Sequence, residues 1–337
     1  MRESGILMHI TSLPGPYGVG TMGKQAFAFV DFLKQAGQKC WQILPLTPTG
    51  FGDSPYQSCS TFAGNHYLID LELLVEKGLL LRQEIENICW CDTDEKANFG
   101  LLYENRLAVL RKAYDRFDGA EDFEEFCRDN SDWLSDFALF MALKSFFKEA
   151  PFRSWPEDIR MHWGFALDYY NRTLYFDVEF QKFLQFKFDQ QWTKLKKYAN
   201  DRHIQIVGDI PIYVSPDGAD VWAHPELFQL DEKNESSSIA GCPPDAFAED
   251  GQVWGNPLYR WDFHKATGYE WWVTRMWHSF KLYDVVRIDH FRGFDEYFSI
   301  PYGAKTAHKG HWEKGPGLSL FERIKECLGD KAGIAED

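Results

Sequence analysis

Short apolar runs alternate with helical periodicity at the beginning of the chain. Residues 5–11 and 40–44 are mostly apolar, and each run leads into prolines, a pattern typical of short buried strands. Between them, Ala26, Val30 and Leu33 recur at helical spacing. A strand, a helix and a strand joined by short connections form a βαβ unit, so the pattern predicts two parallel strands in one sheet.

The pattern changes after residue 50. A loop-like stretch rich in Gly, Ser, Asn and Tyr comes first, and helical spacing then dominates to about residue 200, for example at Leu134, Phe137 and Ala138. The chain is therefore predicted to have three parts: 1–50 with the first two strands, 51–200 as a mainly helical insertion, and 201–337 with the later strands.

Three more apolar runs lie in the last part, at 204–211, 285–289 and 332–337. They carry the acidic residues Asp209, Asp289 and Glu336 near their ends. Parallel β/α barrels draw their catalytic groups from the carboxyl ends of several strands. Five such strands predict an α/β fold, a (β/α)8 barrel that lacks its last strands. Because natural domains rarely end on a buried strand, we expect a chain truncated at its C-terminus and inactive by itself.

Residues 231–261 show few periodic signals of either kind. An irregular segment of this length inside a compact domain is usually functional. We interpret it as a lid loop over the site.

Composition narrows the class of protein. No apolar run approaches the roughly 18 residues of a membrane span, so no transmembrane helix is expected. The net charge of −15 disfavours nucleic acids and anionic membranes and favours a neutral substrate. Seven scattered cysteines without a Cys-x-x-Cys pair suit a reducing compartment, which predicts a cytoplasmic protein. The 13 tryptophans are compatible with sugar stacking, although most aromatic side chains fill cores.

One motif points to another class of protein. Residues 18–23 match the G-x-G-x-x-G pattern of dinucleotide-binding folds. However, Pro14 and Pro16 separate the preceding strand from these glycines, and the second strand ends without an acidic residue for a ribose. We therefore interpret the glycines as a loop of the barrel and expect no cofactor. The dispersed histidines and cysteines show no metal-ligand spacing, so no metal is expected either.

The strand 285–289 carries two charges in an apolar run. Arg287 and Asp289 are two residues apart and therefore point to the same side of a strand. An ion pair with Arg287 would hold Asp289 ionised, as a nucleophile requires, although a structural salt bridge gives the same pattern. Glu336 lies 47 residues later, about one β/α repeat, and could supply the second carboxyl of a glycoside-cleaving pair.

Ordered blocks along the whole chain resemble the 4-alpha-glucanotransferases (amylomaltases or disproportionating enzymes, glycoside hydrolase family 77). These blocks include WQILPL at 41–46, GDSPYQS at 52–58, GDIPIYV at 208–214, WGNPLY at 254–259, RIDHFRG at 287–293 and IAED at 334–337. The resemblance implies a (β/α)8 barrel with helical insertions that transfers α-1,4-glucan segments to glucose or to another glucan, with retention of configuration. An α-amylase-type hydrolase and a non-catalytic glycan-binding fragment remain alternatives.

The same resemblance implies roles for individual residues. Asp289 matches the nucleophile and Glu336 the general acid/base. Arg287 and His290 match residues that orient the nucleophile and the donor sugar. Further matches fall on substrate-binding or lid positions, namely Ser54, Tyr56, Asp209, Asp245, Phe247, Gln252, Trp254 and Asn256.

Overall fold

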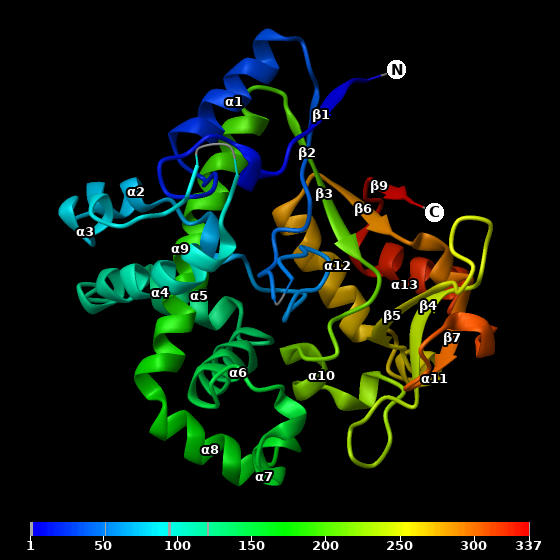
Figure 1. Cartoon of the computed structure of the whole chain (residues 1–337). Coiled ribbons are helices and arrows are strands. Elements are labelled where there is room, and N and C mark those ends of the chain that lie inside the picture. Colours follow the sequence, from blue (N-terminus) through cyan, green and yellow to red (C-terminus); the bar gives the residue numbers. More distant parts are fainter. Residues whose placement is uncertain (1–2, 51, 94–95, 120, 337) are drawn as a thin grey trace.

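The computed structural model describes residues 3–50, 52–93, 96–119 and 121–336 (Figure 1). A sheet of five parallel strands has the order β1-β2-β3-β6-β9, which is also their order along the chain. Its strands are β1 (Gly5–Leu7), β2 (Cys40–Gln42), β3 (Gln205–Pro211), β6 (Val285–Asp289) and β9 (Gly333–Ala335). All five strands were predicted, and their sequential order is that of a β/α barrel rather than of a doubly wound sheet. Asp337, the end of the last predicted strand, lies outside the described residues.

Helices lie between these strands along the chain. They are α1 (Lys24–Gln35), α10 (Ala219–Ala223), α11 (Trp261–Ala266), α12 (Glu270–Leu282) and α13 (Leu318–Leu328). The helix predicted between the first two strands is confirmed: Ala26, Val30 and Leu33 of α1 are buried, and Gly37 follows with a positive φ of 71°. Glycine adopts this left-handed conformation at low cost, so it ends the helix.

Helices also dominate the described residues between 71 and 200. They are α2 (Leu71–Glu76), α3 (Gln83–Glu86), α4 (Phe99–Asp115), α5 (Glu121–Asp129), α6 (Leu134–Phe146), α7 (Glu157–Arg160), α8 (Gly164–Thr173) and α9 (Tyr175–Asn200). The long helix α9 packs against α4, α5 and α6 and then reaches the sheet, where it contacts α1 and β3 (Figure 1). One hydrophobic core therefore runs from the helical part into the sheet.

A second sheet, which the sequence did not predict, flanks the first. Its antiparallel order is β5-β4-β7-β8, with β4 (Ser238–Cys242), β5 (Gln252–Pro257), β7 (Glu296–Pro301) and β8 (His311–Lys314). The expectation of an irregular segment at 231–261 was therefore wrong for β4 and β5. These strands lack a clear alternation because small residues are needed there. A Cβ atom on Gly241 would lie 2.1 Å from the carbonyl oxygen of Gln252.

The expectation that all five parallel strands are buried was also wrong. The outer strands β1 and β9 each pair on one side only, and all three residues of β9 are exposed. Inner strands have neighbours on both sides, and β3 is buried along most of its length. Within the described ranges, no helix is both long enough and apolar enough to cross a membrane.

Candidate active site

The guanidinium of Arg287 lies among three carboxylates at the carboxyl end of the parallel sheet. Its Nη1 is 2.8 and 2.7 Å from the two carboxylate oxygens of Asp209. Its Nη2 is 3.2 Å from Asp289 Oδ1 and also 3.2 Å from Glu336 Oε1. The structure thus brings together the three acidic residues that the sequence placed at strand ends.

Strand register explains this convergence. In the parallel pairing of β3 with β6, Asp209 lies opposite Arg287, and Arg287 in turn lies opposite Ile334 of β9. Side chains at equivalent heights on neighbouring parallel strands point to the same face. Arg287 and Asp289 also point to one side, as predicted from their spacing.

Asp209 is the anchor of this cluster. It is only 1% exposed, and Tyr56 donates a 2.8 Å hydrogen bond from its hydroxyl to Asp209 Oδ2. Burial raises the pKa of Asp209, whereas the hydrogen bonds from Arg287 and Tyr56 act in the opposite direction. Burial and the bond to Asp209 likewise raise the pKa of the Tyr56 hydroxyl, which therefore stays a donor.

Backbone N–H groups hold Glu336. The N–H of His290 donates to Glu336 Oε2 at 3.1 Å, and the N–H of Phe291 donates to the Glu336 carbonyl at 2.6 Å. His290 has a φ of 54°, in the left-handed region that costs free energy for a residue with a side chain. This turn directly follows Asp289, so one short segment positions both catalytic candidates.

The predicted ion pair between Arg287 and Asp289 is present, at 3.2 Å, but other groups also act on Asp289. Burial raises the pKa of Asp289, and the negative charges of Asp209 and Glu336 raise it further. Arg287 opposes these effects, but its two shorter contacts are with Asp209. Because three carboxylates share one cation, Asp209 and Asp289 bind a proton at a higher pH than isolated aspartates do.

Aromatic rings form one wall beside the carboxylates. The ring of Trp254, on β5, meets the ring of His290 edge-on with centroids 4.9 Å apart. Tyr213, just after β3, lies 6.2 Å from the Trp254 ring and 6.4 Å from the His290 ring. Sequence reasoning missed Tyr213. Its position just past a strand that carries Asp209 was the available signal.

The other predicted residues make contacts near this cluster or on the β4–β5 connection. Ser54 accepts a hydrogen bond from the backbone N–H of Tyr56 at 3.3 Å. Between β4 and β5, Asp245 accepts from the backbone N–H groups of Phe247 and Ala248, and the side chain of Phe247 is fully exposed. Gln252 accepts a hydrogen bond from the indole N–H of Trp254.

Asn256 has a different environment. Its buried amide donates a 2.7 Å hydrogen bond to the carbonyl of Val214, so it ties β5 to the loop after β3.

Other parts of the protein fill the space beside the glycines of the 18–23 motif. A Cβ on Gly20 would lie 2.0 Å from the carbonyl oxygen of Ile10, and a Cβ on Gly23 would lie 1.9 Å from Asp70 Oδ2. Thr21 also donates to this carboxylate, at 2.6 Å. A carboxylate at the start of α1 stands where a dinucleotide phosphate would have to bind, which disfavours a nucleotide there. The described residues also hold no group of three or more His, Cys, Asp or Glu side chains arranged for a metal ion.

Comparisons with known proteins agree on one family. The family model described as 4-alpha-glucanotransferase matches residues 8–337. A 4-alpha-glucanotransferase of Clostridium butyricum is 51% identical over 98% of this chain and 68% of its own length. A 4-alpha-glucanotransferase of Thermus thermophilus is 46% identical, over 100% of this chain and 67% of its own length. The chain thus spans about two thirds of these relatives.

Solved structures give the same result. An amylomaltase from Streptococcus agalactiae, in complex with acarbose, superimposes with a TM-score of 0.97 at 46% identity. This alignment covers 100% of the present chain and 69% of the amylomaltase. An amylomaltase from Corynebacterium glutamicum shares the fold at 20% identity, with a TM-score of 0.76 over 99% of this chain and 47% of its own.

Proposed function

Because the chain belongs to the 4-alpha-glucanotransferase family, we propose that Asp289 and Glu336 carry out the transfer. The reaction moves a segment of an α-1,4-glucan, such as a maltooligosaccharide, to the 4-hydroxyl of glucose or of another glucan. The nucleophile is Asp289 and the general acid/base is Glu336. Arg287, Asp209 and Tyr56 hold these groups in place.

The transfer takes two displacements. A carboxylate oxygen of Asp289 attacks the anomeric carbon while Glu336 gives its proton to the glycosidic oxygen, which leaves with the first glucan. The 4-hydroxyl of the acceptor then attacks the glycosyl-enzyme and loses its proton to Glu336, and the bond to Asp289 breaks. Two inversions retain the α configuration.

The contact of both carboxylates with one guanidinium nitrogen is the observation that supports this mechanism best. Asp289 Oδ1 and Glu336 Oε1 each lie 3.2 Å from Arg287 Nη2. The distance between these two oxygens therefore cannot exceed twice 3.2 Å. Retaining enzymes hold their carboxyls about 5–5.5 Å apart, whereas inverting enzymes need roughly 6.5–9.5 Å to admit water. The geometry therefore favours a covalent intermediate.

Transfer rather than hydrolysis requires that an acceptor sugar, not water, reaches this intermediate. Trp254 already stands beside His290, and Phe247 projects from the β4–β5 connection with its ring exposed. An exposed phenyl ring can stack on the apolar face of a sugar. Closure of this connection over a bound acceptor would exclude water, and the segment 231–261 would then act as the lid.

Incubation of the native protein with maltotriose tests the proposal. We expect glucose together with maltooligosaccharides longer than maltotriose, and loss of this activity by at least about a thousandfold in Asp289→Ala. Maltose and glucose without longer products would instead indicate an α-amylase-type hydrolase. Unchanged activity in Asp289→Ala would remove the assigned nucleophile and leave the glycan-binding alternative.

A further inference from the structure

The loop after β3 joins the active site to the helical part of the chain. This loop, defined here as residues 212–220 and so including the first two residues of α10, carries Tyr213 of the aromatic wall at its beginning. Its far end contacts the segment that follows Tyr56: the N–H of Ala219 donates to the Cys59 carbonyl at 2.8 Å. Asp220, which is buried, accepts hydrogen bonds from both the N–H and the hydroxyl of Thr61, each at 2.9 Å. Displacement of the loop would therefore disturb both Tyr213 and Tyr56.

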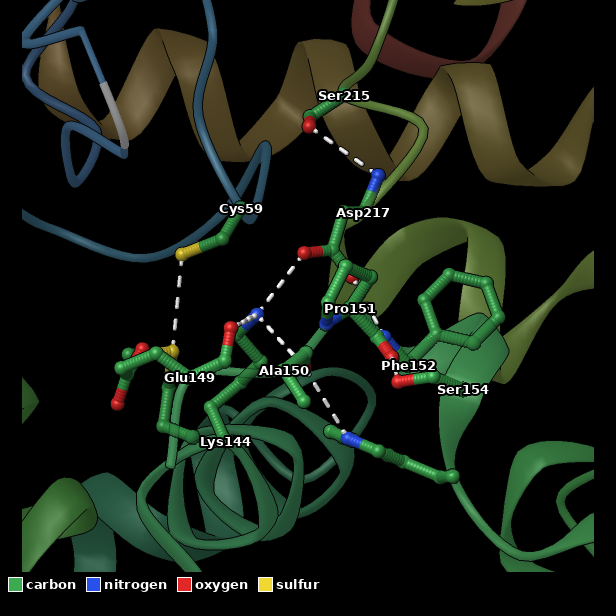
Figure 2. A network of polar contacts seen from close by, with 11 residues as sticks. Cys59, Lys144, Glu149, Ala150, Pro151, Phe152, Ser154, Ser215 and Asp217 are labelled. Atoms are coloured by element: carbon green, nitrogen blue, oxygen red, sulfur yellow. Dashed lines mark hydrogen bonds and ion pairs between the residues drawn. The ribbon is translucent and has the colours of Figure 1, made fainter. Parts of the chain in front are cut away.

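The ammonium group of Lys144 fixes the middle of this loop (Figure 2). Lys144 lies near the end of α6, and its side chain is 11% exposed. Its Nζ is 2.9 Å from Asp217 Oδ2 and donates to the carbonyls of Glu149 and Ala150 at 3.0 and 3.1 Å. The other oxygen of Asp217 accepts from the N–H of Phe152 at 2.9 Å. All three donors of the ammonium group are thus used.

The chain around Lys144 adopts an unfavourable backbone conformation. Lys148 and Glu149 follow one another with φ values of 54° and 61°, and neither is a glycine. Such residues cost free energy and persist only where the surroundings hold them. The carbonyl of Glu149 accepts from the Lys144 ammonium, and its N–H donates to the Lys144 carbonyl at 2.7 Å. A helix can end without two consecutive residues of positive φ, so the hydrogen bonds to Lys144 hold this segment in a conformation that helix termination does not require.

We propose that Lys144 is a positioning residue of the active site, which acts through Asp217 and loop 212–220 on Tyr56 and Tyr213. Its ammonium group contacts Asp217 rather than Asp209, Asp289 or Glu336. Its role is to dock the helical part on the loop, so that Tyr56 keeps its hydrogen bond to Asp209. The inference rests on the proposed function, since it concerns the same carboxylates.

Lys144→Met tests the inference, because methionine keeps the apolar stem and removes the three donors. At a temperature well below the Tm of the variant, we expect kcat/KM for maltotriose to fall on the order of tenfold, since small misplacements of catalytic groups are costly. The acidic limb of the pH–rate profile should shift in the same direction as in Tyr56→Phe. Because both changes act on Tyr56, their effects on kcat/KM should be less than additive: Lys144→Met should slow the Tyr56→Phe variant by a smaller factor than it slows the wild type.

Lys187→Met is the matched control. Lys187 is also buried in the helical part, where its ammonium lies over the rings of Phe117 and Phe186, away from loop 212–220. We expect its kcat/KM and pH profile to match the wild type. A lower Tm for Lys144→Met with unchanged kcat/KM, or independent effects of Lys144→Met and Tyr56→Phe, would overturn the inference. Wild-type protein without transfer activity would instead overturn the proposed function.

Discussion

At the residue scale, the main feature of the site is that three carboxylates contact the single guanidinium of Arg287. Asp209 takes the two shorter contacts with Arg287, and Asp289 and Glu336 share the other nitrogen. The proposed nucleophile, Asp289, is therefore less strongly paired than the anchoring Asp209. A fully paired carboxylate would attack an anomeric carbon poorly, whereas a carboxylate with a raised pKa is the more basic group. We therefore expect Arg287 to orient the proposed nucleophile without neutralising it.

Tyr56→Phe should change the pH dependence of transfer. The hydroxyl of Tyr56 lowers the pKa of Asp209, so its removal lets that pKa rise further above the usual value. Asp209 is then protonated at a higher pH and releases Arg287. One hydrogen bond is worth about 0.5–1.5 kcal/mol, so the acidic limb of kcat/KM should move upward by roughly half to one pH unit.

Profiles of kcat/KM against pH for both proteins measure this shift. The alkaline limb should stay in place, because Tyr56 stabilises the anionic form of Asp209 only. An acidic limb that does not move, or that moves to lower pH, would contradict the assigned role of Tyr56.

At the element scale, parallel strands and their ends were predictable because each is a local signal. The segments that form β3 and β6 combine β-branched residues with charged ones. Because side chains two residues apart on a strand share a face, the sequence shows which of them point to the same side. The strands β4 and β5 were not predictable in this way. Their pairing joins β4 to β7, about 60 residues later, and small residues such as Gly241 obscure the alternation. Only tertiary contacts select such strands.

Gly208 shows how closely the elements around Asp209 pack. A Cβ at this position of β3 would lie 2.0 Å from the ring of Tyr283, which is fully buried. Gly208→Ala should therefore push β3 or the ring aside and cost about 1–3 kcal/mol in the free energy of unfolding, with a loss of activity because Asp209 is the next residue. Chemical denaturation, together with maltotriose transfer assays, measures both effects.

Gly164→Ala is the control for this substitution. Gly164 begins α8, and a methyl group added to it would meet no heavy atom within 4 Å. Its φ also lies outside the left-handed region. Alanine favours helices over glycine, so this variant should be as stable as the wild type or up to about 1 kcal/mol more stable. Equal destabilisation by both substitutions would show that packing against Tyr283 is not the cause.

On the scale of the whole molecule, the acid/base candidate stands at the outer edge of the parallel sheet. Glu336 follows β9, which pairs only with β6, whereas Asp209 and Asp289 lie on strands with neighbours on both sides. The sequence supported the pairing of Asp289 with Glu336 by spacing and resemblance. It could not reveal that two backbone N–H groups after Asp289 hold Glu336, because the left-handed turn at His290 has no sequence signature.

This arrangement predicts uneven stability across the parallel sheet. Backbone amides of β9 should exchange with solvent far faster than those of β3, because β9 is exposed and has one neighbouring strand. Glu336 would then leave its place beside Arg287 whenever β9 opens, so conditions that speed exchange in β9 should slow transfer from maltotriose. Hydrogen exchange followed by mass spectrometry, with the same sample assayed for transfer, checks both statements. Equal protection of β9 and β3, or rapid transfer despite fast exchange in β9, would show that Glu336 is held independently of its strand or is not the acid/base.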